Sequence, residues 1–298
     1  MKKIFAVIMA LAAVACSNDD IISIDRQAIG FGNPFVENSV RADYSDGKTL
    51  GAFTVYGTVT SKSNSNSVAL FGGDGANVTG SVGATAWNCT ETEYWVPNCT
   101  YAFQAVADGV INNGAITVSV GNGDLDLLYA EKSAETNENA APTSGVNGNK
   151  VVEFNFTHLM SKVGFSFVNG SANTAYGYNI TAVSFKGHDI TGTYTISESK
   201  WDTAVTASDT ALSFGTGTTT HQIIPGKQTL NVTVAYDIVY NGETMGSTSF
   251  TKSLEYTFEQ SKSYSIVVTI PAPGEPIQFA VVNDLGWTDG GSTNLDKE

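Results

Sequence analysis

The chain has 298 residues, of which 15% are charged, and 29 acidic against 15 basic side chains give a formal net charge of −14. Such an acidic surface repels phosphate backbones, so nucleic acid is excluded as an expected partner. The length allows one large or two ordinary domains, and the many β-branched, aromatic and turn-forming residues favour strands over helices.

The N-terminus has the pattern of an export signal. Lys2 and Lys3 precede an apolar stretch, residues 4–14, that is too short to span a bilayer. Small residues then form a cleavage pattern, and Cys16 follows at the position that is acylated in bacterial lipoproteins. We therefore predict that residues 1–15 are a lipoprotein signal peptide and that Cys16 carries the lipid, since multiple acyl chains anchor a protein durably.

Alternation of apolar and polar residues dominates the rest of the chain and begins at residues 53–55. It recurs at residues 116–120, and a long polar run over residues 131–150 follows. A polar stretch of that length is uncommon inside a compact domain. We therefore expect a junction near residue 150, with an N-terminal β-sandwich domain over residues 16–150 and a C-terminal β-sandwich domain over residues 151–298.

The alternation changes phase at the start of the C-terminal half. Apolar residues alternate from Val152 to Phe156 and continue to His158, whereas the next run, Val163 to Phe167, has the opposite parity. A bend or bulge must therefore separate the two strands. His158 falls on the apolar side, where we expect a hydrogen-bonded structural histidine rather than a ligand.

Three further alternating segments are indicated towards the C-terminus. Residues 230–240 form the longest alternating run, and the Asn-Gly pair behind it is a strong hairpin signal. Residues 264–270 alternate as well, and Ile277, Phe279 and Val281 repeat the pattern. Since no stretch of a dozen residues shows a helical stripe, the predicted fold class is all-β.

Two cysteines remain in the exported part of the chain, Cys89 and Cys99. An even pair in an oxidising compartment predicts a disulfide across a short hairpin or loop. Two buried free thiols are the alternative.

The sequence contains no converging set of catalytic groups. It has no Gly-x-Ser-x-Gly elbow and no phosphate-binding or dinucleotide glycine loop, and its three histidines are too scattered to indicate a metal site. We expect no enzyme activity, no metal and no cofactor. Two alternatives stay open: a carboxylate pair for glycoside hydrolysis, whose spacing is spatial, and a sugar-stacking platform on Trp87 and Trp95, for which core packing is the competing interpretation.

Several motifs, in order along the chain, resemble those of the fimbrillin family, also described as Mfa-like or type V pilins. They are the lipoprotein start, Trp87 ahead of residues 94–97 and 101–105, residues 126–130, residues 152–163, residues 223–226 and residues 277–287. The most specific lies within residues 152–163, where a strand, His158, a small bend and Lys162 follow one another as in the family's hallmark motif.

This resemblance implies two transthyretin-like β-sandwich domains in tandem, attached by lipid to the outer membrane at a bacterial cell surface. The acidic cluster at residues 17–20 resembles the signal that sends lipoproteins of such bacteria to the outer face. The implied partners are other fimbrial subunits in a head-to-tail homo- or heteropolymer. A host protein or a glycan stays open as a receptor.

The resemblance also implies assembly by strand exchange after cleavage by an arginine-specific protease. Of the two arginines in the chain, Arg41 is the predicted cleavage site and Arg26 is the second choice. Cleavage at Arg41 would release residues 27–41 as the displaced strand, although Gly30 and its neighbouring Gly and Pro residues make it an irregular one.

The predicted donor strand lies within residues 277–287, where Ile277, Phe279 and Val281 alternate as insertion into a groove requires. The alternative is that this segment forms the last strand of its own domain. The sequence thus predicts a structural or adhesive subunit of a fimbria. The competing interpretation is a surface glycan-binding lipoprotein that never polymerises.

Overall fold

The computed structural model describes residues 27–36, 43–44, 48–81, 83–84, 86–119, 125–135, 151–202, 207–283 and 293–294. The predicted signal peptide at residues 1–15, the predicted lipidation site Cys16 and the predicted cleavage site Arg41 lie outside these residues. The predicted all-β fold is confirmed, because within the described ranges the regular elements are strands and two one-turn 3-10 helices, η2 (Phe71–Gly73) and η3 (Ile196–Glu198). No helix in that part of the chain is long and apolar enough to cross a bilayer.

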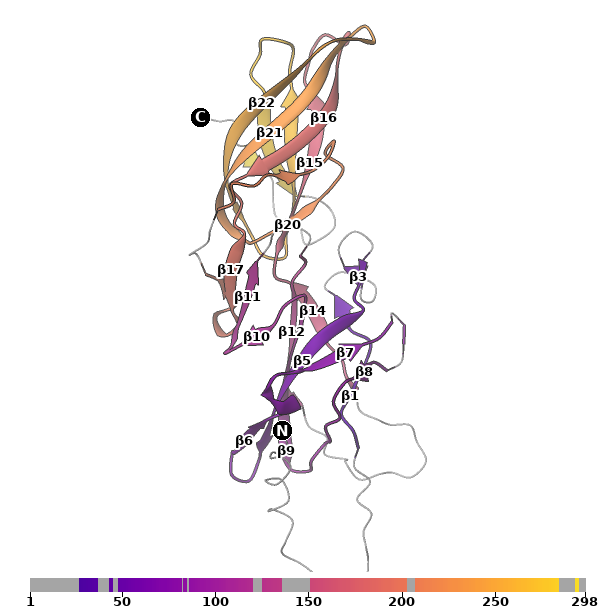
Figure 1. The fold of residues 1–298 in the computed structure, drawn as a ribbon, viewed down its shortest axis with the longest axis vertical. Helices are drawn as coiled ribbons and strands as arrows, with labels where there is room; N and C mark the ends of the chain where they lie inside the picture. Colours follow the sequence, from indigo (N-terminus) through magenta and orange to yellow (C-terminus); the bar gives the residue numbers. More distant parts are fainter. Residues whose placement is uncertain are drawn as a thin grey trace, which may run out of the picture.

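The molecule is elongated, with one sheet-rich region at each end of its long axis (Figure 1). We call the region around the core of Phe53, Phe103 and Phe156 the N-terminal lobe, and the region around the core of Phe185, Val232 and Ile266 the C-terminal lobe. A smaller sheet lies between them.

The N-terminal lobe is built on one large sheet. Its strand order is β2 (Phe35–Val36), β14 (Asn155–His158), β12 (Leu128–Glu135), β9 (Cys99–Ala107), β5 (Ala52–Ser61), β7 (Ala76–Thr79) and β8 (Asn88–Cys89), with β6 (Ser67–Ala69) paired to β5. Beside it lie the parallel pair β1 (Gly30–Phe31) and β13 (Val151–Val152) and the hairpin of β3 (Asp43–Tyr44) and β4 (Lys48–Thr49).

The C-terminal lobe is a sandwich of two sheets. One has the order β20 (His221–Ile223), β15 (Ser161–Asn169), β23 (Ser263–Ile270), β24 (Gln278–Asn283) and β25 (Thr293–Asn294). The other has the order β19 (Leu212–Ser213), β16 (Tyr176–Lys186), β21 (Gly226–Tyr240) and β22 (Glu243–Phe258). Apolar side chains of both sheets form a single core between them.

The alternating run at residues 230–240 behaves as its pattern predicts. Leu230, Val232 and Val234 in β21 are fully buried, while the residues between them face away from the core. The hairpin to β22 turns at Asn241 and Gly242, which both have positive φ, at 49° and 84°. Positive φ at both central residues is what a type I′ turn needs, and this explains the Asn-Gly pair.

The sheet between the lobes is shared by both halves of the chain. β10 (Ile111–Asn112) and β11 (Ala115–Ser119) come from the N-terminal half, and β17 (Thr191–Thr195) and β18 (Lys200–Trp201) from the C-terminal half. β11 and β17 pair over their whole length and lie side by side at the waist of the molecule (Figure 1). A third core, which includes Ile116, Tyr194 and Trp201, packs against this sheet.

The chain crosses from one lobe to the other at Leu159 and Met160, between β14 and β15. β13 and β14 belong to the N-terminal lobe, since they pair with β1, β2 and β12. The division into two domains with a junction near residue 150 remains a prediction, and this pairing favours a junction at the bend after His158.

Candidate functional site

Residues 27–36 are inserted into the N-terminal lobe as an irregular strand. β1 runs parallel to β13, and β2 runs parallel to β14. The Gly32 N–H donates to the Val152 carbonyl at 3.0 Å, and the Phe35 N–H donates to the Phe154 carbonyl at 2.8 Å. One backbone edge of the segment is therefore satisfied by the strands that lead to the bend.

The other edge of the same segment is bonded to residues 87–95. The Ile29 N–H donates to the Glu93 carbonyl at 2.8 Å, and the Trp87 and Trp95 N–H groups donate to the carbonyls of Phe31 and Gln27, each at 2.9 Å. Residues 27–36 thus fill a groove that has a hydrogen-bonding wall on each side.

The side chains of the segment complete the core of the N-terminal lobe. Phe31 is 1% exposed, and its ring lies 6.1–6.4 Å from four other rings. Those rings belong to Phe53, Phe71, Phe103 and Phe154. Val36 and Ile29 are buried as well, whereas Phe35 is 40% exposed. Removal of the segment would therefore leave an apolar cavity and two unpaired edges.

The segment fits its groove imperfectly. A Cβ atom at Gly32 would lie 2.8 Å from the Glu153 side chain, so any larger residue here would force that side chain to move. The Asn33 side-chain oxygen is buried without a hydrogen-bond partner among the described residues, and Pro34 has no N–H to donate. These features split the segment into two short strands, as its Gly and Pro content predicts.

The proposed donor segment lies in its own lobe in this structure. β24 pairs antiparallel with β23, with Phe279 opposite Val268 and Val281 opposite Ile266. Phe279 and Val281 are buried in the C-terminal core, and Ile277 packs against it. In this structure the segment therefore forms a strand of its own domain, which is the alternative stated above. A role as donor strand remains a proposal.

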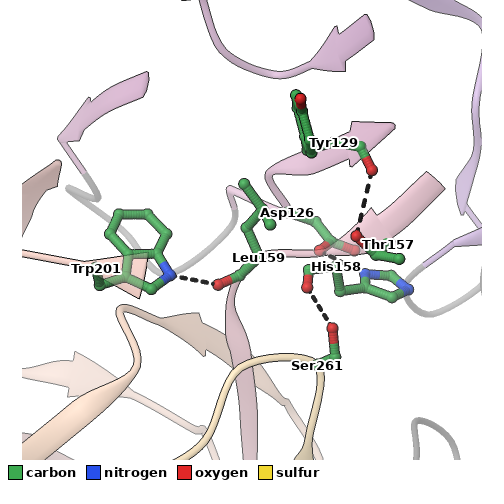
Figure 2. Close-up of polar contacts among 7 residues, drawn as sticks. All are labelled: Asp126, Tyr129, Thr157, His158, Leu159, Trp201 and Ser261. Atoms are coloured by element: carbon green, nitrogen blue, oxygen red, sulfur yellow. Dashed lines mark hydrogen bonds and ion pairs between the residues drawn. The ribbon is translucent and has the colours of Figure 1, made fainter. Parts of the chain in front are cut away.

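His158 forms a buried pair at the bend between the lobes. Its Nδ1 lies 2.8 Å from Oδ1 of Asp126, with side-chain exposures of 5% and 1% (Figure 2). Oδ2 of Asp126 has no hydrogen-bond partner within the described ranges. The pair therefore fixes the end of β14, and the predicted structural role of His158 agrees with this geometry.

Backbone carbonyls at the same bend are held by side chains from distant parts of the chain. Ser261 Oγ donates to the His158 carbonyl, and Trp201 Nε1 donates to the Leu159 carbonyl at 2.7 Å (Figure 2). The Lys162 N–H donates to the Lys262 carbonyl at 2.9 Å as β15 begins. The two residues of the hallmark motif, His158 and Lys162, thus stand on either side of a bend that both lobes stabilise.

The predicted disulfide between Cys89 and Cys99 is wrong, because both residues are free thiols. Cys89 pairs with Val78 of β7, and Val78 pairs with Phe53 near one end of β5. Cys99 lies opposite Ser61 at the other end of β5. At about 3.3 Å per residue, roughly 25 Å of strand separates the two positions. A disulfide needs Cα atoms within about 7 Å.

Of the two interpretations left open for Trp87 and Trp95, the structure supports core packing and contradicts the sugar-stacking platform. The two side chains are 4% and 3% exposed. Trp87 packs on Phe53 with ring centroids 5.7 Å apart, and Trp95 packs edge-on against Tyr101 at 4.7 Å. Both tryptophans are core residues beside the groove, which leaves no ring face free for a sugar.

The other two histidines lie in the C-terminal lobe. His188 is 1% exposed, packs against Phe185 and has no hydrogen-bond partner on either ring nitrogen among the described residues. His221 Nε2 lies 2.8 Å from the Ser213 carbonyl. Burial, and to a lesser extent the nearby His221, lowers the pKa of His188 to about 4. Across the described ranges, no three His, Cys, Asp or Glu side chains gather as a metal site would require.

The buried His188 predicts a loss of stability in mild acid. Its pKa falls from 6.5 when unfolded to about 4 when folded, so the unfolded chain binds the extra proton between these values. The contribution of neutral His188 to the free energy of unfolding is fully present above pH 6.5. It declines as the pH falls towards 4, by on the order of 2 kcal/mol in total. Urea unfolding at pH 7 and pH 4.5 should show a smaller difference in His188→Leu than in the native protein. An unchanged pH dependence in the variant would contradict the assignment.

Sequence reasoning missed the partners that hold the bend. Asp126 follows a glycine-rich stretch of the sequence, and Ser261 and Trp201 lie far from His158 in sequence. The available signal was that His158 falls on the apolar face of its strand. A buried histidine requires a hydrogen-bond partner, but the sequence does not identify which residue provides it. The groove lining at residues 87–95 was visible only as an aromatic-rich stretch.

Comparison with known proteins covers most of the chain. The model of a family described as fimbrillin-like matches residues 41–284. Among curated proteins, none matches.

Three solved structures share the fold at low sequence identity. A fimbrial protein from Bacteroides vulgatus has a TM-score of 0.55 at 15% identity, with 87% of this chain and 100% of that chain covered. Candidate cell adhesion proteins from Bacteroides uniformis and Bacteroides ovatus each have a TM-score of 0.52 at 14% identity. Both matches cover 88% of this chain, and 98% and 99% of the respective relatives.

Proposed function

This chain belongs to the fimbrillin-like family, and from that membership we propose that it is a surface-exposed fimbrial subunit assembled by donor-strand exchange. Proteins of the same fold are described as fimbrial and cell adhesion proteins. Cys16 would carry the lipid that attaches the subunit to the outer membrane. Other fimbrial subunits would be its partners, and we propose no catalytic activity.

The observation that carries this proposal is the inserted segment at residues 27–36. It is bonded on both edges and places Phe31 in the core, yet glycines and a proline interrupt it and one of its polar atoms lacks a partner. A groove that is filled so irregularly could accept a more regular strand in place of residues 27–36. An incoming strand would restore the backbone hydrogen bonds and fill the pockets with alternate side chains.

Arg41 is placed in sequence where a cut would be effective. It follows the inserted segment and precedes β5, so cleavage there would leave residues 27–36 held only by non-covalent contacts. Cleavage at Arg26 would leave the segment connected to its lobe. This difference favours Arg41 as the activating site.

Ile277, Phe279 and Val281 would supply the donor strand. Phe279 and Val281 lie in β24, the last long strand of the C-terminal lobe, and Ile277 directly precedes it. Donation from the C-terminal lobe of one subunit to the N-terminal lobe of the next is head-to-tail. A contact of this kind does not close on itself and therefore builds a filament.

The test is controlled cleavage of the purified protein with an arginine-specific protease. We expect cleavage after Arg41 to yield a ladder of stable oligomers, and Arg41→Lys to stay monomeric under the same treatment. Arg26→Lys is the matched control and should still form the ladder. Persistent monomers after confirmed cleavage at Arg41 would contradict a polymerising role.

The non-polymerising glycan-binding alternative loses its original support, since Trp87 and Trp95 are buried in the N-terminal core. A glycan site elsewhere on the subunit is a separate question.

A further inference from the structure

A pocket of about 520 Å³ with both polar and apolar lining residues lies beside the sheet that joins the lobes. Its walls come from β18, from the connection between β20 and β21 at Pro225, from the turn at Gln260 and from Asp189. The volume falls within the range of small-molecule sites. Neither the inserted segment nor β24 lines it, so the proposed assembly mechanism does not explain it.

Asp189 is the most unusual residue of this pocket. It is 7% exposed, and its carboxylate has no hydrogen-bond or ion-pair partner in the part of the chain that the structure describes. Only its backbone N–H is bonded, to Gln228 Oε1 at 3.4 Å. Burial raises the pKa of this carboxyl group. The carboxylate oxygens are not among the fully enclosed unpartnered polar atoms, so they remain accessible from the pocket, where a ligand could donate hydrogen bonds to them.

The other polar side chains of the pocket can offer a ligand both hydrogen-bond donors and hydrogen-bond acceptors. The Gln260 side chain has no hydrogen bond among the described residues, so its amide can donate and accept. Lys200 and Lys227 each bond one carboxylate, Glu198 at 2.5 Å and Glu255 at 2.8 Å. Each ammonium group has three donors, so both lysines keep donors for a ligand while their charges are balanced.

Trp201 supplies an apolar wall with a fixed orientation. Its Nε1 is committed to the Leu159 carbonyl at 2.7 Å, and its ring packs against Tyr194 at 5.6 Å. Trp201 and Pro225 are the larger apolar residues that line the pocket, although Trp201 is only 9% exposed.

These groups select the chemistry of the ligand. An anion is disfavoured, because Asp189 and Asp202 are both acidic and the two lysines are already paired. A purely apolar ligand would leave the Asp189 carboxylate buried without a partner. A neutral sugar offers hydroxyl donors to Asp189, hydroxyl acceptors to the lysines, and both to Gln260. We propose that this pocket binds a neutral sugar unit of a surface glycan.

The experiment is a screen of the purified protein on an array of neutral and acidic oligosaccharides, followed by titration of the best neutral ligand. We expect the native protein to bind a neutral glycan, and Asp189→Asn and Gln260→Ala each to weaken binding about tenfold or more. Asp209→Asn makes the same chemical change at an exposed position of the same lobe, and it should bind like the native protein.

Thermal melting shows whether each variant is folded. Asp189→Asn should melt no lower than the native protein, since it removes a buried unpaired carboxylate. The proposal is overturned if the native protein binds no neutral glycan, if it binds acidic glycans alone, or if binding survives both pocket substitutions. Because protease-induced oligomers form at another site, that assay separates failure of the pocket from failure of the proposed fimbrial role.

Discussion

Replacing Phe31 by alanine is expected to lower the free energy of unfolding of the N-terminal lobe by about 3–5 kcal/mol. The side chain is 1% exposed and lies among four aromatic rings, including that of Phe154 stacked at an interplanar angle of 14°. Truncation would remove these contacts and leave a cavity that the surrounding sheet cannot close. Urea unfolding followed by tryptophan fluorescence measures the change, since Trp87 and Trp95 lie in the same core.

Phe35→Ala provides the matched control for this prediction. It makes the same substitution in the same inserted segment, but the side chain is 40% exposed. We expect its effect to stay below about 1 kcal/mol. Equal effects of the two substitutions would mean that residues 27–36 do not occupy the groove in solution. Phe31→Ala should also speed protease-induced oligomer formation, because a weakened resident segment leaves more easily.

The second large effect is expected at the bend between the lobes. His158→Ala would leave Asp126 buried without its partner, and breaking a buried pair in this way costs about 3–5 kcal/mol. The existing geometry makes the loss severe, because Asp126 is 1% exposed and its other oxygen already lacks a partner among the described residues. Chemical unfolding at pH 7 measures the change.

A double-mutant cycle separates the pair from simple loss of packing. Asp126→Ala with His158→Ala should destabilise by clearly less than the sum of the single changes, since the second substitution removes the orphaned partner. Additive effects would show that the two side chains do not interact in the folded protein. Asp209→Asn, a change at an exposed acidic residue of the C-terminal lobe, should have little effect on stability.

Local patterns in the sequence predicted the local parts of this fold well. The alternation at residues 230–240 identifies β21, because a strand with one buried face must repeat every two residues. The Asn241 and Gly242 turn follows from the φ values that a two-residue hairpin loop requires. The change of phase after His158 predicted the bend, since a regular strand cannot switch faces without one.

Long-range contacts could not be predicted in the same way. Cys89 and Cys99 are close in sequence but are carried to opposite ends of β5 by different strand partners. Trp87 and Trp95 appeared suitable for a surface because they flank a loop. Both are instead buried in the same core as Phe31 of the inserted segment. The link between His158 and Asp126 depends on the pairing of β12 with β14, which no local pattern specifies.

The candidate groove could be predicted only in part. The sequence identified residues 27–36 as an irregular strand ahead of Arg41, because glycine and proline interrupt its apolar residues. It did not reveal that the segment runs parallel to β13 and β14, or that residues 87–95 bond its second edge. Both walls come from positions far along the chain, and their register is set by the tertiary fold.

The shared sheet at the waist has a mechanical consequence. β11 and β17 belong to opposite halves of the chain, pair over five residues and run roughly along the long axis (Figure 1). When the ends of the molecule are pulled apart, the two strands are drawn past one another, so the hydrogen bonds of the ladder resist together. A ladder lying across the axis would instead open one bond at a time. A subunit under tension would thus stretch little at its middle, where a single peptide crossing alone would act as a hinge.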